Sequence, residues 1–203
     1  MRVNIRGDTV EIEGYVNAIE RDSKPLRDRI GQFIERICKG AFKRALTRND
    51  DVHILLNHDW TRDLGSTKRG NLELHEDSIG LHARACISDP EVIKKARAGE
   101  LVGWSFGFED RDVEKREKDG MPYRAVKDLD LYEVSILDKT KSPAYEGTLI
   151  AARADDAPYN VSETMPFECT VTETETRDET PVEDNTIDYT KYIKIIEEMK
   201  GEK

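Results

Sequence analysis

The sequence lacks several features that would place it in a familiar class of protein. Its 203 residues contain no run of about 18 apolar residues, so no membrane span is expected. The N-terminal segment MRVNIRGDTVEIEGY has no apolar stretch of the kind found in signal peptides. The three cysteines, Cys38, Cys86 and Cys169, are scattered and form no C-x-x-C pair. That pattern favours reduced thiols in a cytosolic compartment over a disulfide framework or a zinc site.

The sequence also lacks a net positive charge, and its negative charge is unevenly distributed. The formal net charge is −10, and residues 155–186 hold ten acidic residues against one basic residue, Arg177. Residues 1–154 are therefore almost neutral, which gives no electrostatic argument for a nucleic-acid partner. The acidity belongs to a C-terminal tail.

Composition and hydrophobic period divide the chain into three parts. Residues 1–153 contain short runs with strand period, such as TVEIEGYVNAIE and DVHILLNH, together with helical signals. SDPEVIKKARAGE has a capping residue, a first-turn proline and a terminating glycine, which together predict a helix. RIGQFIERI has apolar residues at helical spacing, and an irregular loop is the alternative for it. Residues 154–186 are rich in Thr, Glu, Asp and Pro, which predicts a disordered linker. A short helix is predicted for residues 187–203. The prediction is an α+β domain of mostly antiparallel strands followed by an acidic tail.

Ser105 lies at the centre of a G-x-S-x-G frame in LVGWSFGFED. Strand alternation places Trp104, Phe106 and Phe108 on one face, as a core stripe, and Ser105 on the other face among glycines. Those glycines leave room for another backbone, either a substrate peptide or a bulge or strand crossing. The nucleophile elbow of an α/β-hydrolase is excluded, because that fold needs a histidine after the serine and all four histidines precede it.

A serine nucleophile needs a base, and histidine is the usual one. In DVHILLNHD, His58 shares the phase of Val52, Ile54 and Leu56 and extends their buried face, whereas His53 has the opposite phase. One strand cannot aim both rings at one metal, so no metal site and no cofactor are expected. His58 is the best base candidate, and a structural histidine at a strand end is the alternative.

A third group should orient the imidazole ring. In LYEVSIL, Glu133 shares a phase with leucines, where a carboxylate is costly to bury without a partner. Protonated His58 would be such a partner, as would an arginine or lysine, and an exposed edge strand with Glu133 in water is the alternative. Asp128, Asp130 and Asp138 have the opposite phase and are weaker candidates.

Four segments in order resemble a known family. ERICKGAFKRAL, ILLNHDWTRDLGSTKRGNLELHEDSIGL, GELVGWSFGFED and LYEVSILDKTKSPAYEGT are similar to the prohead maturation protease of tailed bacteriophages. That family is related in fold to the herpesvirus assembly protease, and the resemblance covers about residues 10–150. It implies a serine endopeptidase on a compact, mostly antiparallel β-barrel flanked by helices.

The resemblance also implies roles for residues of this chain. Ser105 corresponds to the nucleophile and His58 to the general base. Glu133 takes the third position, where the herpesvirus relatives have a second histidine and this chain has none. Backbone amides near LDKTKSP would bind the oxyanion.

The implied substrates are the major capsid protein with its scaffolding segment, other scaffold proteins and the protease itself, inside a procapsid in the host cytoplasm. The herpesvirus relatives are activated by dimerisation, which implies a homo-oligomer. A non-catalytic scaffold or capsid-assembly module on the same fold is the alternative, in which Ser105 and His58 are packing residues.

Overall fold

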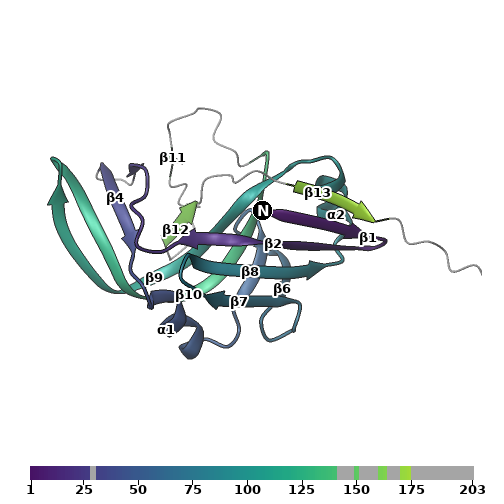
Figure 1. The fold of residues 1–203 in the computed structure, drawn as a ribbon, viewed down its shortest axis with the longest axis horizontal. Helices are drawn as coiled ribbons and strands as arrows, with labels where there is room; N and C mark the ends of the chain where they lie inside the picture. The colour runs from purple at the N-terminus through teal and green to yellow at the C-terminus, as the bar shows by residue number, and fades with distance from the viewer. Residues whose placement is uncertain (28–30, 141–148, 151–159, 164–169, 175–203) are drawn as a thin grey trace, which may run out of the picture.

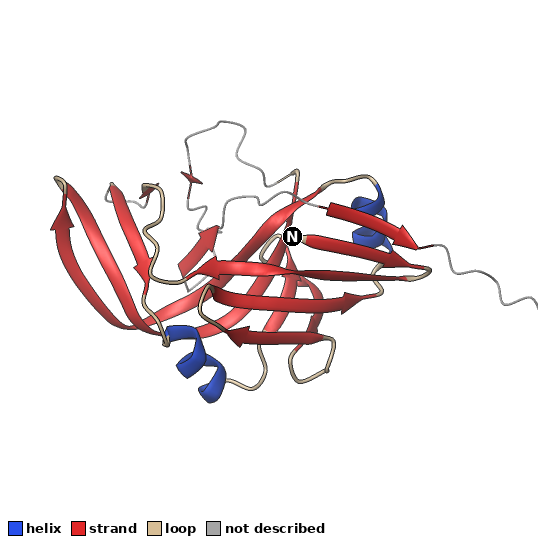
Figure 2. Ribbon diagram, in the orientation of Figure 1, coloured by secondary structure: helices blue, strands red, loops and turns tan. Residues whose placement is uncertain are grey.

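The computed structural model describes residues 1–27, 31–140, 149–150, 160–163 and 170–174, and it is built mostly of strands with two helices (Figures 1 and 2). The strands form two sheets, and both helices lie at their margins. The predicted α+β class is confirmed.

The first sheet has five strands in the order β13-β1-β2-β8-β7. Its neighbours are antiparallel except for β1 and β13, which run parallel. The alternating run TVEIEGYV forms part of β2 as predicted, with Val10 and Ile12 fully buried. The strands are β1 (Arg2–Arg6), β2 (Thr9–Ala18), β7 (Leu72–Glu76), β8 (Gly80–Ile87) and β13 (Thr170–Thr174).

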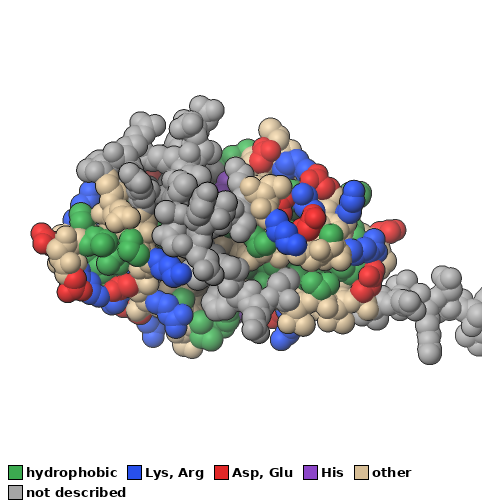
Figure 3. Space-filling model, turned by 90° about the horizontal axis from the view of Figure 1, so that it is seen from above, with side chains coloured by type: hydrophobic (Ala, Val, Ile, Leu, Met, Phe, Trp, Pro, Cys, Tyr) green, Lys and Arg blue, Asp and Glu red, His purple; other side chains and the backbone are tan. Residues whose placement is uncertain are grey.

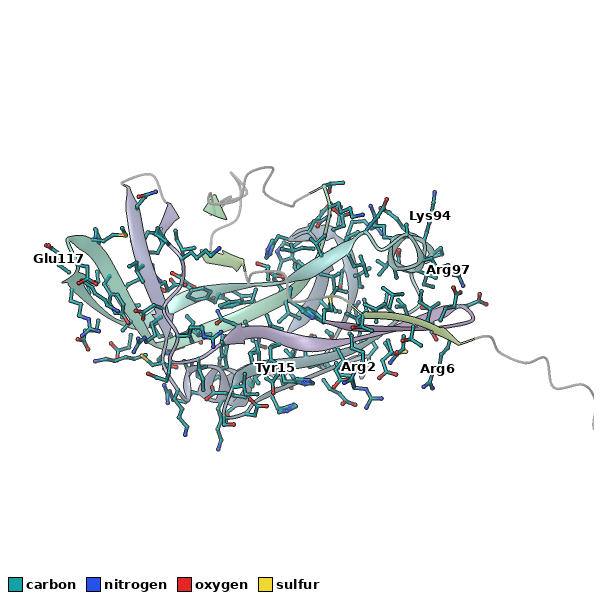
Figure 4. The ribbon with its side chains drawn as sticks, turned by 45° about the horizontal axis from the view of Figure 1, so that its top comes forward. Arg2, Arg6, Tyr15, Lys94, Arg97 and Glu117 are labelled. Atoms are coloured by element: carbon teal, nitrogen blue, oxygen red, sulfur yellow. The ribbon has the colours of Figure 1, made fainter. Side chains whose placement is uncertain are left out.

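The second sheet has eight strands and is organised around the long hairpin of β9 (Leu101–Lys118) and β10 (Met121–Asp138). The far ends of these strands extend from the body as an arm, with β4 beside it and Glu117 near its tip (Figures 1 and 4). The other edge of β10 pairs in parallel with β4 near its start and with β5 near its end. The remaining members are β3 (Leu26–Arg27), β4 (Gln32–Ile37), β5 (His53–Leu56), β6 (Asp59–Ser66), β11 (Leu149–Ile150) and β12 (Asn160–Glu163).

One hydrophobic core lies between the two sheets and beneath the helices α1 (Ala41–Arg48) and α2 (Pro90–Arg97). The aromatic stripe Trp104, Phe106 and Phe108 is part of it, as the alternation in β9 predicts. The Phe106 ring stacks on Phe108 with centroids 5.1 Å apart and meets Phe42 of α1 edge-on at 5.2 Å. This packing fixes the face of β9 that turns away from the core.

Two expectations about architecture need correction. The pairing of the described strands gives two open sheets, and no closed barrel is found among these residues, because the hydrogen-bonded order ends at strands such as β7 and β13. The segment RIGQFIERI, predicted as a helix, contains β4, whose residues from Ile34 to Ile37 pair with β10. Although its apolar residues have helical spacing, the segment pairs with β10 and forms a strand.

The helix predicted at SDPEVIKKARAGE is confirmed as α2. Asp89 caps it by accepting hydrogen bonds from the amides of Glu91 and Val92, Pro90 is its first residue, and Gly99 follows with a positive φ of 61°. Figure 3 views the molecule from above the orientation of Figure 1, and basic and acidic side chains are mixed over the described part of that surface. No helix among the described residues is long and apolar enough to cross a membrane.

Two short strands lie within the segment 154–186 that the composition predicts to be a disordered linker. β12 pairs with β9, and β13 pairs with β1 and forms an ion pair between Glu173 and Arg97 of α2 at 2.9 Å (Figure 4). The division into a domain at 1–153 and a tail stays a prediction, and the helix predicted at 187–203 lies outside the described residues.

Candidate active site

His58 lies in a two-residue turn between β5 and β6. Asn57 and His58 are its central residues, with φ values of 58° and 60°, and Leu56 pairs with Asp59 on either side. Positive φ at both central positions is the geometry of the tight turns that match the twist of a hairpin, and asparagine and histidine tolerate it better than most residues. The Asn-His pair is therefore a turn signal in the sequence.

Backbone and side-chain hydrogen bonds hold this turn on β10. The Asn57 amide donates to the Ile136 carbonyl at 2.9 Å, and the Asp138 amide donates to Asn57 Oδ1 at 3.0 Å. The His58 amide donates to Ser135 Oγ at 3.0 Å. The backbone of His58 is thus fixed against the end of β10.

The turn also corrects the predicted orientation of His58. Strand alternation placed its side chain on the face of Ile54 and Leu56, which are buried in the core. The strand ends at Leu56, however, and the positive φ values that follow interrupt the alternation. The His58 ring instead reaches Glu133 on β10.

A β-bulge at Tyr132 sets the direction of Glu133. The register of β10 against β9 shifts between Leu131 and Glu133, so Tyr132 is an extra residue. Leu129 and Leu131 belong to the core before the bulge, whereas Val134 and Ile136 belong to it afterwards. Glu133 therefore does not share the face of Leu129 and Leu131, as the unbroken alternation predicted. Bulges next to active sites commonly re-aim a side chain in this way.

Glu133 is fully buried, and two hydrogen bonds satisfy its carboxylate. His58 Nδ1 lies 2.7 Å from Oε1, and the Ser135 hydroxyl donates to Oε2 at 2.6 Å. With a carboxylate oxygen as the acceptor, Nδ1 is the donor of this hydrogen bond, and Nε2 is the ring nitrogen that remains outside it. Among the described residues, the buried Nε2 has no hydrogen-bond partner.

Ser105 lies on the strand next to this pair. In the β9–β10 register it is directly opposite Ser135, and Gly107 is opposite Glu133. Residues directly opposite in an antiparallel pair have Cβ atoms about 4.5–5.5 Å apart and project to the same face. Ser105, Ser135 and Glu133 are therefore neighbours on the face that turns away from the aromatic stripe, and Ser105 is fully buried there.

Ser135 is the site residue that sequence reasoning did not single out. It bonds both the carboxylate of Glu133 and the backbone of His58. Its position two residues after Glu133 in a strand places both on one face, which is the signal that could have identified it. His53, in contrast, lies 3.2 Å from Asp63 on β6.

Asp138 closes the end of β10 behind the turn. Burial would raise the pKa of this carboxyl, but hydrogen bonds from Lys95, Thr140 and Asn57 outweigh it and lower the pKa to about 2. Lys95 Nζ of α2 lies 2.8 Å from Asp138 Oδ2. The ionised Asp138 therefore joins α2, β10 and the His58 turn.

Asp128 and Asp130, the other carboxylates weighed as the third group, are engaged by cations. Arg48 contacts both of them. The amides predicted to bind the oxyanion lie near LDKTKSP at the end of β10, of which residues 141–143 lie outside the described part. The amide of Lys139 donates to Glu100 and that of Thr140 to Asp138 Oδ1.

Comparison with models of known protein families identifies a family for this chain. The model of the caudovirus prohead serine protease family matches residues 1–160. No curated protein and no solved structure matches the chain. Because the matched region is well over half of the sequence and includes Ser105, His58 and Glu133, the chain belongs to the caudovirus prohead serine protease family.

Proposed function

We propose that this protein is a serine endopeptidase with Ser105 as nucleophile, His58 as general base and Glu133 as the group that orients His58. Membership of the prohead protease family supports a role in phage head maturation. The observation that carries the assignment is the buried 2.7 Å contact between His58 Nδ1 and Glu133 Oε1, directly beside the strand position of Ser105. Carboxylate, imidazole and hydroxyl in this order make up a catalytic triad.

The chemistry follows from the hydrogen-bond directions. The Ser105 hydroxyl attacks the scissile carbonyl and gives its proton to His58 Nε2. The Nδ1 hydrogen is held by Glu133, which fixes the tautomer and stabilises the imidazolium that forms. His58 then delivers the proton to the leaving amine, and a water repeats the sequence to release the acyl group. Backbone amides in the segment after β10 are the proposed donors to the oxyanion.

Ser135 acts as a positioning residue in this scheme. Its hydroxyl holds the second oxygen of Glu133, and its oxygen accepts the His58 amide. The side chain of Glu133 and the backbone of His58 are thereby tied to one atom, which limits how far the base can move from its orienting group.

The proposed substrates are the major capsid protein with its scaffolding segment, other scaffold proteins and the protease itself, cleaved inside the procapsid. A prohead protease acts in that compartment and on capsid proteins. A homo-oligomeric active form is part of the same proposal.

The test is co-expression with the capsid and scaffold proteins, followed by intact-mass spectrometry. Wild type is compared with Ser105→Ala and with Ser66→Ala, a buried serine on β6 outside the site. Fragments of capsid protein and protease are expected with wild type and Ser66→Ala and not with Ser105→Ala.

Two outcomes would contradict the proposal. Fragments that persist with Ser105→Ala would show that another protease makes them. Particles that assemble without fragments in any sample would favour a non-catalytic assembly module on this fold.

A further inference from the structure

The strand that carries Ser105 has one edge that β10 does not occupy. β10 pairs along the length of β9 on one side, and the described partner on the other side is β12, residues Asn160–Glu163. The pairing is antiparallel, with Glu163 opposite Ser105 and Val161 opposite Gly107. Without β12, this edge would display backbone N–H and C=O groups that can pair with another extended chain.

The site is closed in this arrangement. Ser105 and Glu133 are fully buried, and the His58 side chain is 11% exposed. A nucleophile has to approach a substrate carbonyl to about 3–3.5 Å before it reacts. An external peptide therefore needs a displacement near Ser105, and the strand paired beside this residue is β12.

We propose that this edge of β9 is the peptide-binding edge of the enzyme and that residues 160–163 of the same chain occupy it in place of substrate. The external partner is then an extended polypeptide segment that adds to β9 as an antiparallel strand. Main-chain hydrogen bonds provide affinity in this mode of recognition, and alternate side chains provide specificity. The inference rests on the proposed function, since it treats Ser105 as the nucleophile.

The size and composition of β12 suit a strand that can be displaced. β12 pairs with β9 over only four residues, whereas β9 and β10 pair over most of their length. Three residues of β12, Asn160, Ser162 and Glu163, are polar. Asparagine and glutamate are depleted in strands, and short strands are weakly held. Substrate segments that pair over more residues would compete successfully.

β13 keeps this internal competitor close to the site. It follows β12 in the chain and is held on the body by its pairing with β1 and by the Glu173–Arg97 ion pair (Figure 4). A tethered strand competes at a high effective concentration. It lowers the apparent affinity of the edge for an external peptide in proportion to the fraction of molecules that are closed.

The experiment compares the full chain with two double variants of β12. Alternate residues of an antiparallel strand direct their N–H groups to the partner, so Val161→Pro/Ser162→Pro removes one N–H that faces β9 in either phase. The control, Val161→Ala/Ser162→Ala, keeps both N–H groups. Intact mass confirms beforehand that residues 160–163 are present in every sample.

The probe is an alkyl fluorophosphonate, which requires no knowledge of the cleavage sequence. The Ser105 oxygen forms a bond to phosphorus, the P–F bond breaks, fluoride leaves and the hydroxyl proton passes to His58. The labelling rate is followed by intact mass. The proline variant is expected to label about fivefold faster or more, because a larger fraction of its molecules is open. The alanine variant should label at the wild-type rate.

The labelling rates distinguish the role of β12 from the role of Ser105. Equal labelling rates in wild type and in a folded proline variant would overturn the role of β12 and leave the nucleophile intact. Adducts that also form on Ser105→Ala, or no adduct in any variant, would overturn the proposed function and this inference with it. If the proline variant shows no cooperative melt, Val161→Gly/Ser162→Gly weakens the strand without fixing φ, and an intermediate acceleration is expected.

Discussion

Two fully or nearly fully buried glutamates lie in the same eight-stranded sheet, and their partners differ in kind. Glu133 on β10 is bonded to the imidazole of His58 and the hydroxyl of Ser135. Glu35 on β4 lies 2.8 Å from the guanidinium of Arg124, which also contacts Asp110. Burial raises the pKa of Glu35 to about 7, although Arg124 opposes the shift.

The comparison distinguishes the arrangement proposed to be catalytic from a structural ion pair. Glu35 faces Arg124, a permanent cation, so the ion pair can hold β4 to β10, but the guanidinium cannot accept a proton from a nucleophile. Glu133 faces the imidazole of His58, a side chain type that serves as a general base, with a serine on the next strand. Burial of a carboxylate alone therefore does not mark a catalytic residue, and the proposal for Glu133 rests on the chemistry of its partner.

The largest expected difference is in activity. Glu133→Gln should lower the cleavage rate about 10²–10⁴-fold, since a neutral amide does not stabilise the imidazolium. Glu35→Gln should leave the rate unchanged. Both are measured on purified capsid protein as substrate, with thermal melts to confirm folding. Similar losses in the two variants would contradict a catalytic role that belongs to Glu133 alone.

The next largest effect concerns stability. Arg124→Met should reduce the free energy of unfolding by about 3–5 kcal/mol at pH 8.5, because Glu35 is left buried without its cation. The loss should be much smaller at pH 5, where Glu35 is protonated. Urea unfolding at the two pH values measures both. An equal loss at both would mean that Arg124 acts through packing, for example on Phe33, whose ring centre is 5.8 Å away.

The raised pKa of Glu35 also predicts a pH dependence of wild-type stability. An ordinary glutamate has a pKa of 4.5, and Glu35 has one of about 7 in the folded chain. Between these values the folded state binds more protons than the unfolded state, so stability falls as pH rises, by about 3 kcal/mol in total. Glu35→Gln should remove this part of the slope, whereas Glu133→Gln should not remove it. Urea titrations at several pH values between 4 and 8 test this.

The smallest expected effect is that of the positioning hydroxyl. Ser135→Ala should lower kcat about 10–100-fold with little change in KM, because one charge-assisted hydrogen bond to Glu133 is lost. Ser135→Thr, which keeps the hydroxyl, should recover much of the rate, and Ser66→Ala should have no effect. A fall in thermal stability with unchanged kcat would assign Ser135 a structural role instead.

Sequence patterns predicted the strand and helix that surround the candidate site better than the orientation of its side chains. The alternation in β9 placed Ser105 opposite the aromatic stripe because that strand is regular where the stripe lies. The cap residues of α2 identified a helix whose determinants are all local. Both predictions depended on contacts between residues close in sequence.

Predictions failed where the backbone departs from a regular period. The positive φ of Asn57 and His58 turned the His58 ring away from the face of Leu56, and the bulge at Tyr132 did the same for Glu133. The helix predicted for the segment of β4 is wrong, because β4 is stabilised by parallel pairing with residues of β10 about 90 positions away. Only the assembled sheet specifies such features, and here they direct the two side chains that meet beside Ser105.

The most direct test of the proposed catalytic role of Ser105 is to locate the reactive hydroxyl. Wild type and His58→Asn are treated with an alkyl fluorophosphonate and the adduct is mapped by tandem mass spectrometry; asparagine is chosen because it tolerates the positive φ at position 58. A single adduct on Ser105 is expected in wild type, with labelling slowed at least about 10³-fold in His58→Asn. An adduct on another residue such as Ser135, or equal labelling of the two proteins, would contradict it.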